Sequence, residues 1–80
     1  MKARIKITLK HGVLDPQGKA IQNALVGLGI TGINEVRQGK YIEIDLDETC
    51  ASKARALVET ICTELLANLV IENYTYELTP

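Results

Sequence analysis

The stretch from Val36 to Leu46 constrains the fold more than any other part of the sequence. One strand is predicted to end at Gln38 and Gly39 and a second to begin at Lys40, because glycine accepts the positive φ that a tight hairpin turn requires. The second strand alternates, with Ile42, Ile44 and Leu46 on one face and Tyr41, Glu43 and Asp45 on the other. This pattern predicts a sheet with one apolar face and one charged face.

A strand and a helix are predicted before this hairpin. Residues 2–10 alternate as a half-buried strand, whose apolar side carries Ala3, Ile5, Ile7 and Leu9. A helix is predicted to start at Asp15 and Pro16, because an aspartate side chain caps free amides and proline fits the first turn. Gly29 is placed to end this helix in a left-handed conformation.

A second helix and a last strand are predicted after the hairpin. The helix begins at Ala51, after capping acceptors at residues 47–49, and fades near Asn68. Its apolar stripe comprises Ala54, Leu57, Val58, Ile61, Cys62 and Leu65. Residues 70–78 are predicted to form a strand, with Tyr74, Tyr76 and Leu78 on one side.

The order of these elements is strand, helix, strand, strand, helix, strand. It predicts an α+β, ferredoxin-like βαββαβ fold in which a four-stranded antiparallel sheet carries two helices on one face. Residues 1–80 are expected to form a single domain, with the first and third strands at the centre of the sheet. The other face would then display Arg4 and Lys6 next to Glu43 and Asp45.

Composition and charge exclude several classes of protein. The formal net charge of −1 gives no field to attract phosphate backbones, so nucleic acid is not an expected partner. No apolar run approaches the roughly 20 residues that span a bilayer, and the charged start lacks the apolar stretch of a signal peptide. We therefore expect a cytoplasmic protein with no membrane partner. Cys50 and Cys62 are expected to be reduced and packed, because they lie twelve helical positions, about 18 Å, apart, which is beyond the reach of a disulfide.

No catalytic, cofactor-binding or metal-ligating residue is predicted. His11 is the only histidine, and it lies in a loop, which makes a nucleophile with a histidine base improbable. Lys10, His11 and Lys19 surround the start of the first helix, where an anion could bind, but solvated surface is the favoured interpretation. Glu43 and Asp45 are interpreted as salt-paired surface. The remaining interpretation is a domain that binds another protein or a small effector molecule.

Three runs of residues are similar to one known family. The runs are Gly12–Gly18, Val36–Glu43 and a third that reads Cys62, Glu64, Leu65, Leu66, Ala67, Asn68, Val70, Ile71 and Glu72. Together they resemble PurS, the small subunit of phosphoribosylformylglycinamidine synthase, in order and over essentially the whole chain. Leu69 departs from the proline that relatives often carry there, which leaves the end of the second helix less fixed.

The resemblance implies a non-catalytic subunit of the ATP- and glutamine-dependent ligase that makes formylglycinamidine ribonucleotide in purine biosynthesis. It implies a homodimer or higher homo-oligomer that bridges a large synthase subunit and a glutaminase subunit. ATP and Mg would bind the large subunit, and this chain would bind neither. The residues carried over as candidates for partner contact are Gly12, Asp15, Gln17, Arg37, Lys40 and Tyr41. The alternative is a small effector-binding regulatory domain of ferredoxin-like fold.

Overall fold

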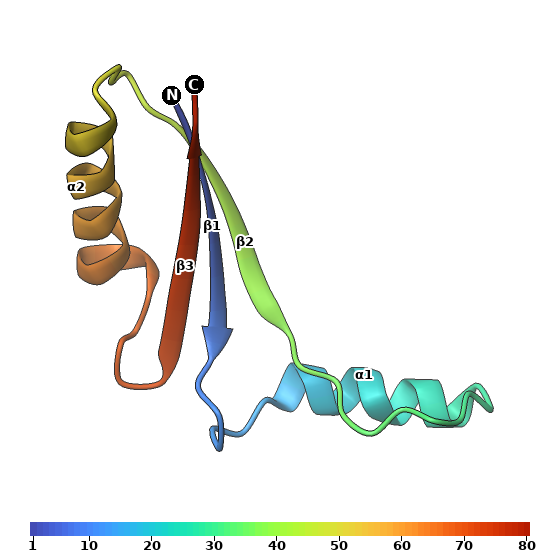
Figure 1. Cartoon of the computed structure of the whole chain (residues 1–80). Coiled ribbons are helices and arrows are strands. Elements are labelled where there is room, and N and C mark those ends of the chain that lie inside the picture. The colour runs from blue at the N-terminus through green and yellow to red at the C-terminus, as the bar shows by residue number, and fades with distance from the viewer.

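The computed structural model describes all 80 residues, and three strands and two helices make up its regular structure (Figure 1). The elements in chain order are β1 (Lys2–Leu9), α1 (Pro16–Gly27), β2 (Gly39–Asp45), α2 (Ala51–Ile61), a π-helical turn (Cys62–Leu66) and β3 (Glu72–Thr79). The α+β class is confirmed. The two chain ends lie side by side at one end of the sheet (Figure 1), where Lys2 is in register with Thr79.

The three strands form one antiparallel sheet in the order β2-β1-β3. The predicted alternation is confirmed, because Ala3, Ile5 and Ile7 of the central strand are buried while Lys6 and Thr8 are exposed. We call the side with Ile5 the core face and the side with Lys6 the outer face. In register with Ile5 lie Ile42 of β2 and Tyr76 of β3. The core therefore runs across all three strands on one face only.

The predicted hairpin and fourth strand are wrong for the single chain. Residues 30–38 form no strand, so the sheet has three strands, with β1 alone at its centre. Gly39 does not adopt a positive φ and makes no turn. It lies opposite Thr8 at the start of β2, where a Cβ would come within 2.5 Å of the carbonyl oxygen of Ile7. Gly39 is thus required for close approach of two strands rather than for a reversal of the chain.

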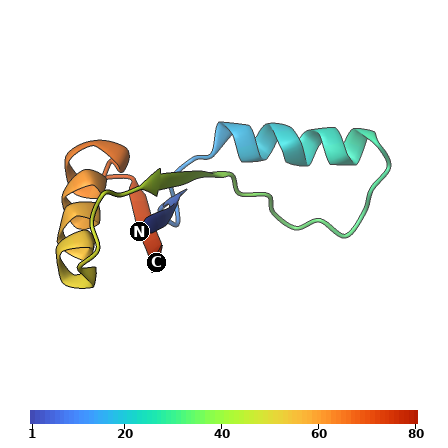
Figure 2. The same ribbon diagram turned by 90° about the horizontal axis from the view of Figure 1, so that it is seen from above.

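Helix α1 forms where it was expected but does not cover the sheet. Asp15 caps its first turn, and Gly29 follows its end with a φ of 79°. Figures 1 and 2 show α1 projecting away from the strands, with the chain returning alongside it to β2. We call residues 11–38 the arm. The prediction of two helices on one face is therefore wrong for the single chain.

The arm gives the molecule an elongated shape. Its extents are 50 × 26 × 15 Å. The radius of gyration is 16.1 Å, whereas a compact chain of this length has a value of about 12 Å. Only 9 of the 80 residues are buried, and none of them belongs to an apolar cluster between arm and sheet. The single chain therefore leaves much of its apolar surface in water.

Helix α2 covers part of the core face. Ala54, Val58 and Cys62 are fully buried against the sheet. A π-helical turn follows, closed by the Ala67 N–H donating to the carbonyl of Cys62. Its wider winding places Leu66 against the core and leaves Leu65 exposed, so the prediction of Leu65 as part of the buried stripe is wrong.

The two cysteines differ in environment. Both thiols are free, as expected, and burial raises the pKa of the Cys62 thiol. Cys50 is exposed at the start of α2, so only one of the two predicted packed thiols is packed. None of the helices is both long and apolar enough to cross a bilayer.

Candidate functional site

The arm joins the sheet at a neck where two of the predicted contact segments meet. Asp15 precedes α1, and its Oδ1 accepts a hydrogen bond from the Gly18 N–H at 2.8 Å. Its Oδ2 accepts from the Gln38 N–H at 2.7 Å, across 23 residues of sequence. These two amides lower the pKa of the Asp15 carboxyl below its ordinary value. One carboxylate therefore caps the helix and also ties the end of the arm to its beginning.

Arg37 makes the second connection in the neck. Its Nη2 donates to the carbonyl oxygens of Leu9 and Lys10, both at 3.1 Å. Its Nη1 pairs with Glu35 Oε1 at 3.4 Å. The guanidinium thus binds the carbonyl oxygens of the last residue of β1 and of the residue after it, and it uses most of its N–H donors within the chain.

Gln17, Gly18 and Gly12 complete the neck. The Gln38 side-chain amide donates to the Gln17 side-chain oxygen. Gly18 is buried between the Val36 carbonyl and Asp15, and a Cβ there would lie 2.7 Å from Asp15 Oδ2. Gly12 turns the chain with a φ of 87°, a conformation that residues with a Cβ rarely adopt.

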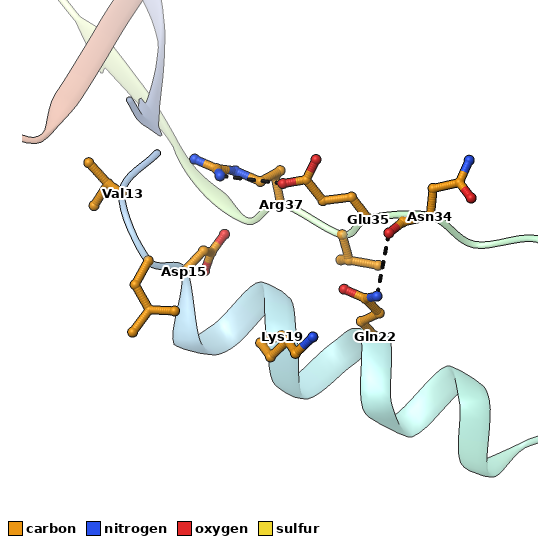
Figure 3. A pocket seen from close by; sticks show the side chains of 9 residues that line it. Val13, Asp15, Lys19, Gln22, Asn34, Glu35 and Arg37 are labelled. Carbon is orange, nitrogen blue, oxygen red and sulfur yellow. Dashed lines mark hydrogen bonds and ion pairs between the residues drawn. The ribbon is translucent and has the colours of Figure 1, made fainter. Parts of the chain in front are cut away.

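A shallow hollow of about 340 Å³ lies between the start of α1 and the returning chain (Figure 3). Asp15 and Lys19 face it from the helix side, and Glu35 and Arg37 from the other (Figure 3). The charges alternate in sign, and Arg37 and Glu35 pair with each other. The hollow therefore offers no single sign of charge to attract a ligand.

The last two predicted contact residues lie on β2 and point to opposite faces. Lys40 shares a second hollow with Asp15 and Gln17, and its Nζ lies 3.8 Å from Glu72 Oε2. Tyr41 stands apart from the neck, 54% exposed on the outer face opposite Lys6. The structure therefore brings four of the six predicted residues together at the neck, places Gly12 in the turn that leads into it, and leaves Tyr41 on the sheet.

The residues considered for chemistry remain dispersed. Glu43 Oε2 pairs with Lys2 Nζ at 3.2 Å, and this hydrogen bond lowers the pKa of Glu43, as expected of salt-paired surface. His11 is exposed beside the end of β1. No three histidine, cysteine or acidic side chains gather closely enough to hold a metal ion.

One polar cluster was not predicted from the sequence. Glu59 of α2 accepts hydrogen bonds from the hydroxyls of Tyr74 and Tyr76 on β3, the latter at 2.8 Å. The bond to Glu59 raises the pKa of Tyr74 to about 12, and the two hydroxyls lower the pKa of Glu59. The i, i+2 spacing of the tyrosines was a usable signal, because it places both on one face of a strand. Their partner on α2 could not be identified from spacing.

The sequence is similar to known proteins over its whole length. The family model described as PurS, phosphoribosylformylglycinamidine (FGAM) synthase, matches residues 2–80. The PurS subunit of this synthase from Synechocystis is 49% identical over 76 residues, which cover 95% of this chain and 76% of that protein. The PurS subunit from Bacillus subtilis is 42% identical over 77 residues, which cover 96% and 90%.

Solved structures show the same fold, arm included. The structure of Bacillus subtilis PurS matches with a TM-score of 0.87 at 42% identity, covering 99% of this chain and 98% of that chain. A chain in the structure of PurLQS from Thermotoga maritima matches with a TM-score of 0.85 at 30% identity, covering 95% and 93%. These matches favour a synthase subunit over an effector-binding domain. The chain therefore belongs to the PurS family and is a subunit of phosphoribosylformylglycinamidine synthase, an enzyme of purine biosynthesis.

Proposed function

We propose that this chain is the assembly subunit of the synthase and contributes no catalytic group. It dimerises and bridges the ATP-dependent large subunit and the glutaminase subunit, so that ammonia from glutamine reaches formylglycinamide ribonucleotide. The observation that carries this proposal is the likeness to a chain of the Thermotoga maritima PurLQS structure, over 95% of the present chain. ATP and Mg bind the large subunit in this scheme, and the complex works in the cytoplasm.

The outer face of the sheet is the surface we assign to the other subunits. No helix of the chain covers it in Figure 2. Tyr41 is exposed there, beside a hollow of about 250 Å³ that Arg4, Lys6 and Glu77 also line. Tyrosine and arginine are the residues that interfaces favour, and the mixed charges can fix the orientation of a partner. Among the six predicted contact residues, we assign Tyr41 to direct contact on this face, and the other five to the neck and the turn that leads into it.

Reconstitution tests the proposed function. Mixing the chain with the large and glutaminase subunits gives a complex by size-exclusion chromatography with light scattering. Glutamine-dependent turnover requires the chain, whereas turnover with added ammonium salts requires it much less, because free ammonia needs no delivery from the glutaminase. Full glutamine-dependent activity without the chain would refute the proposal.

Substitution of Tyr41 tests the proposed surface. Tyr41→Ala weakens the complex about tenfold or more, because a buried aromatic side chain is typical of interface hot spots. Val70→Ala, at a side chain 82% exposed in the turn before β3 and outside this hollow, is the control and leaves affinity nearly unchanged. Titration calorimetry with the large subunit measures both. Equal affinities of Tyr41→Ala and the natural protein would remove this surface from the interface.

A further inference from the structure

Lys6 lies in the middle of the outer face without a counter-charge. Its register partners are Tyr41 on β2 and Thr75 on β3, and neither is acidic. The lysine side chain is exposed and forms no ion pair with any carboxylate of the chain. Interfaces are depleted in lysine, because covering its ammonium group removes the water that solvates the charge. A partner that covers this face must therefore supply an anion to Lys6.

Arg4 is the second cation of the outer face that has no ion pair. It lies opposite Glu43 on β2 and Glu77 on β3, and it pairs with neither carboxylate. Its Nη1 donates instead to the hydroxyl of Thr79 at 3.1 Å, and Glu43 pairs with Lys2 at 3.2 Å. The guanidinium therefore keeps most of its N–H donors available for a partner.

Both cations line the hollow of about 250 Å³ on the outer face. Glu77 is the only acidic residue in the lining, so the hollow carries two positive charges and one negative charge. The hollow at the neck differs, because Arg37 pairs with Glu35 there. Pockets for small molecules usually have volumes of about 300–1,000 Å³, and this hollow is below that range. Its size and its charge both favour a single acidic side chain.

We propose that this hollow takes the carboxylate of one aspartate or glutamate of the large synthase subunit. That carboxylate accepts hydrogen bonds from the Lys6 ammonium and the Arg4 guanidinium, and it brings the charge of the lining to zero. The hydroxyl of exposed Thr75 lies beside Lys6 as a further donor. The inference rests on the proposed function and names the chemical group that the large subunit contributes.

Neutral substitution of Lys6 tests the contact. Lys6→Met removes the charge and weakens binding to the large subunit about tenfold or more, because the partner's carboxylate is then covered without its cation. Lys6→Arg keeps the charge and retains most of the affinity. Lys53→Met is the matched control, because it changes the net charge equally at an exposed position of α2, on the other side of the sheet. Titration calorimetry compares these variants with the natural chain.

The salt dependence of binding is a second measurement, which a purely structural effect of the substitution would leave unchanged. Added salt weakens the natural complex, because it screens the attraction between the cations and the carboxylate. The affinity of Lys6→Met should depend less on salt than that of the natural chain, and Lys53→Met should retain the natural dependence. Circular dichroism shows whether each variant is folded, and Lys6→Gln replaces Lys6→Met if the latter does not fold.

The outcomes separate this inference from the proposed function. If Lys6→Met binds the large subunit as tightly as the natural chain, with the same salt dependence, the contact is wrong and the function stands. A loss of affinity confined to the glutaminase subunit also overturns the contact. So does binding of inorganic phosphate to the natural chain alone that Lys6→Met abolishes, because the hollow is then a site for a free anion. A natural chain that binds neither subunit removes the proposed function together with the contact.

Discussion

Two glycines of the same helix have opposite roles. Gly18 is buried at the neck, against the Val36 carbonyl, whereas a Cβ at Gly27 would meet nothing within 4 Å. In sequence both weaken α1 equally, because glycine lacks the helix propensity of alanine. The contact that requires Gly18 comes from a segment eighteen residues later in the chain, which no local pattern reveals.

Alanine at these two positions should change stability in opposite directions. Gly27→Ala raises the free energy of unfolding by about 0.5–1 kcal/mol, because alanine favours the helix. Gly18→Ala lowers it by about 1–3 kcal/mol, because its methyl group overlaps the neck. Urea unfolding at equal protein concentration measures both. A stabilising Gly18→Ala would show that the neck is not closely packed in solution.

The ionisation of Tyr74 tests the Glu59 cluster. The bond to Glu59 favours the neutral phenol, so this contribution to stability is complete below the ordinary tyrosine pKa of 10 and disappears as pH rises through about 12. Glu59→Gln removes the negative charge, and Tyr74 should then ionise at lower pH. The phenolate absorbance of each protein, minus that of its Tyr74→Phe counterpart, measures this. An unchanged titration would contradict the cluster.

Asp15 shows how far residue-level prediction extends. Its role as a helix cap was predicted from the Asp-Pro pair and is confirmed, because capping depends on neighbours three residues away. Its second oxygen binds the Gln38 amide, which depends on the path of the whole arm. The sequence therefore indicated the first partner of this carboxylate and not the second.

Among the elements, strands were predicted better than their connections. Alternation over β1, β2 and β3 was confirmed, because burial on one face has a period of two residues. The prediction of a hairpin was wrong because sequence alone does not distinguish a glycine that makes a turn from a glycine that lets two strands approach closely. Gly39 is the second kind.

The prediction was also wrong about which leucine packs on the core at the end of α2. An α-helical spacing places Leu65 inward, but the π-helical turn rotates the chain so that Leu66 packs on the core and Leu65 is 79% exposed. Leu66→Ala should therefore lower the free energy of unfolding by about 2 kcal/mol. Leu65→Ala is the matched control, with a change within about 0.5 kcal/mol. Thermal or urea unfolding of the two variants distinguishes a π-helical from an α-helical turn. A larger loss of stability in Leu65→Ala than in Leu66→Ala would indicate that the helix continues as a regular α-helix.

The whole molecule is elongated because its arm meets the sheet only at the neck and then extends away from it. Composition already indicated a thin core, since a chain of 80 residues buries only about 60% of its unfolded surface. The ferredoxin-like pattern predicted both helices and three of the four strands, but not that residues 30–38 form no strand or that α1 projects away from the sheet. Sequence patterns describe which residues are buried and cannot distinguish burial within a chain from burial between chains.

Thermal stability should therefore depend on protein concentration. If folding is linked to association, the melting temperature rises as the protein is concentrated, because mass action favours the dimer. Differential scanning fluorimetry over a hundredfold range of concentration measures the shift. A protein that folds alone has a constant melting temperature, and that outcome would argue against a dimer that stabilises the fold.

The neighbouring chain ends have a practical consequence for engineering. Because Lys2 and Thr79 lie in register on adjacent strands, a short linker can close the chain into a ring without bending the sheet. New ends can then be opened at the arm's tip, where Gly29 and Gly32 turn the backbone with positive φ. Such a circular permutant keeps every strand intact while cutting the link between α1 and the returning segment. It would reveal whether helix and segment need covalent continuity or only each other's proximity.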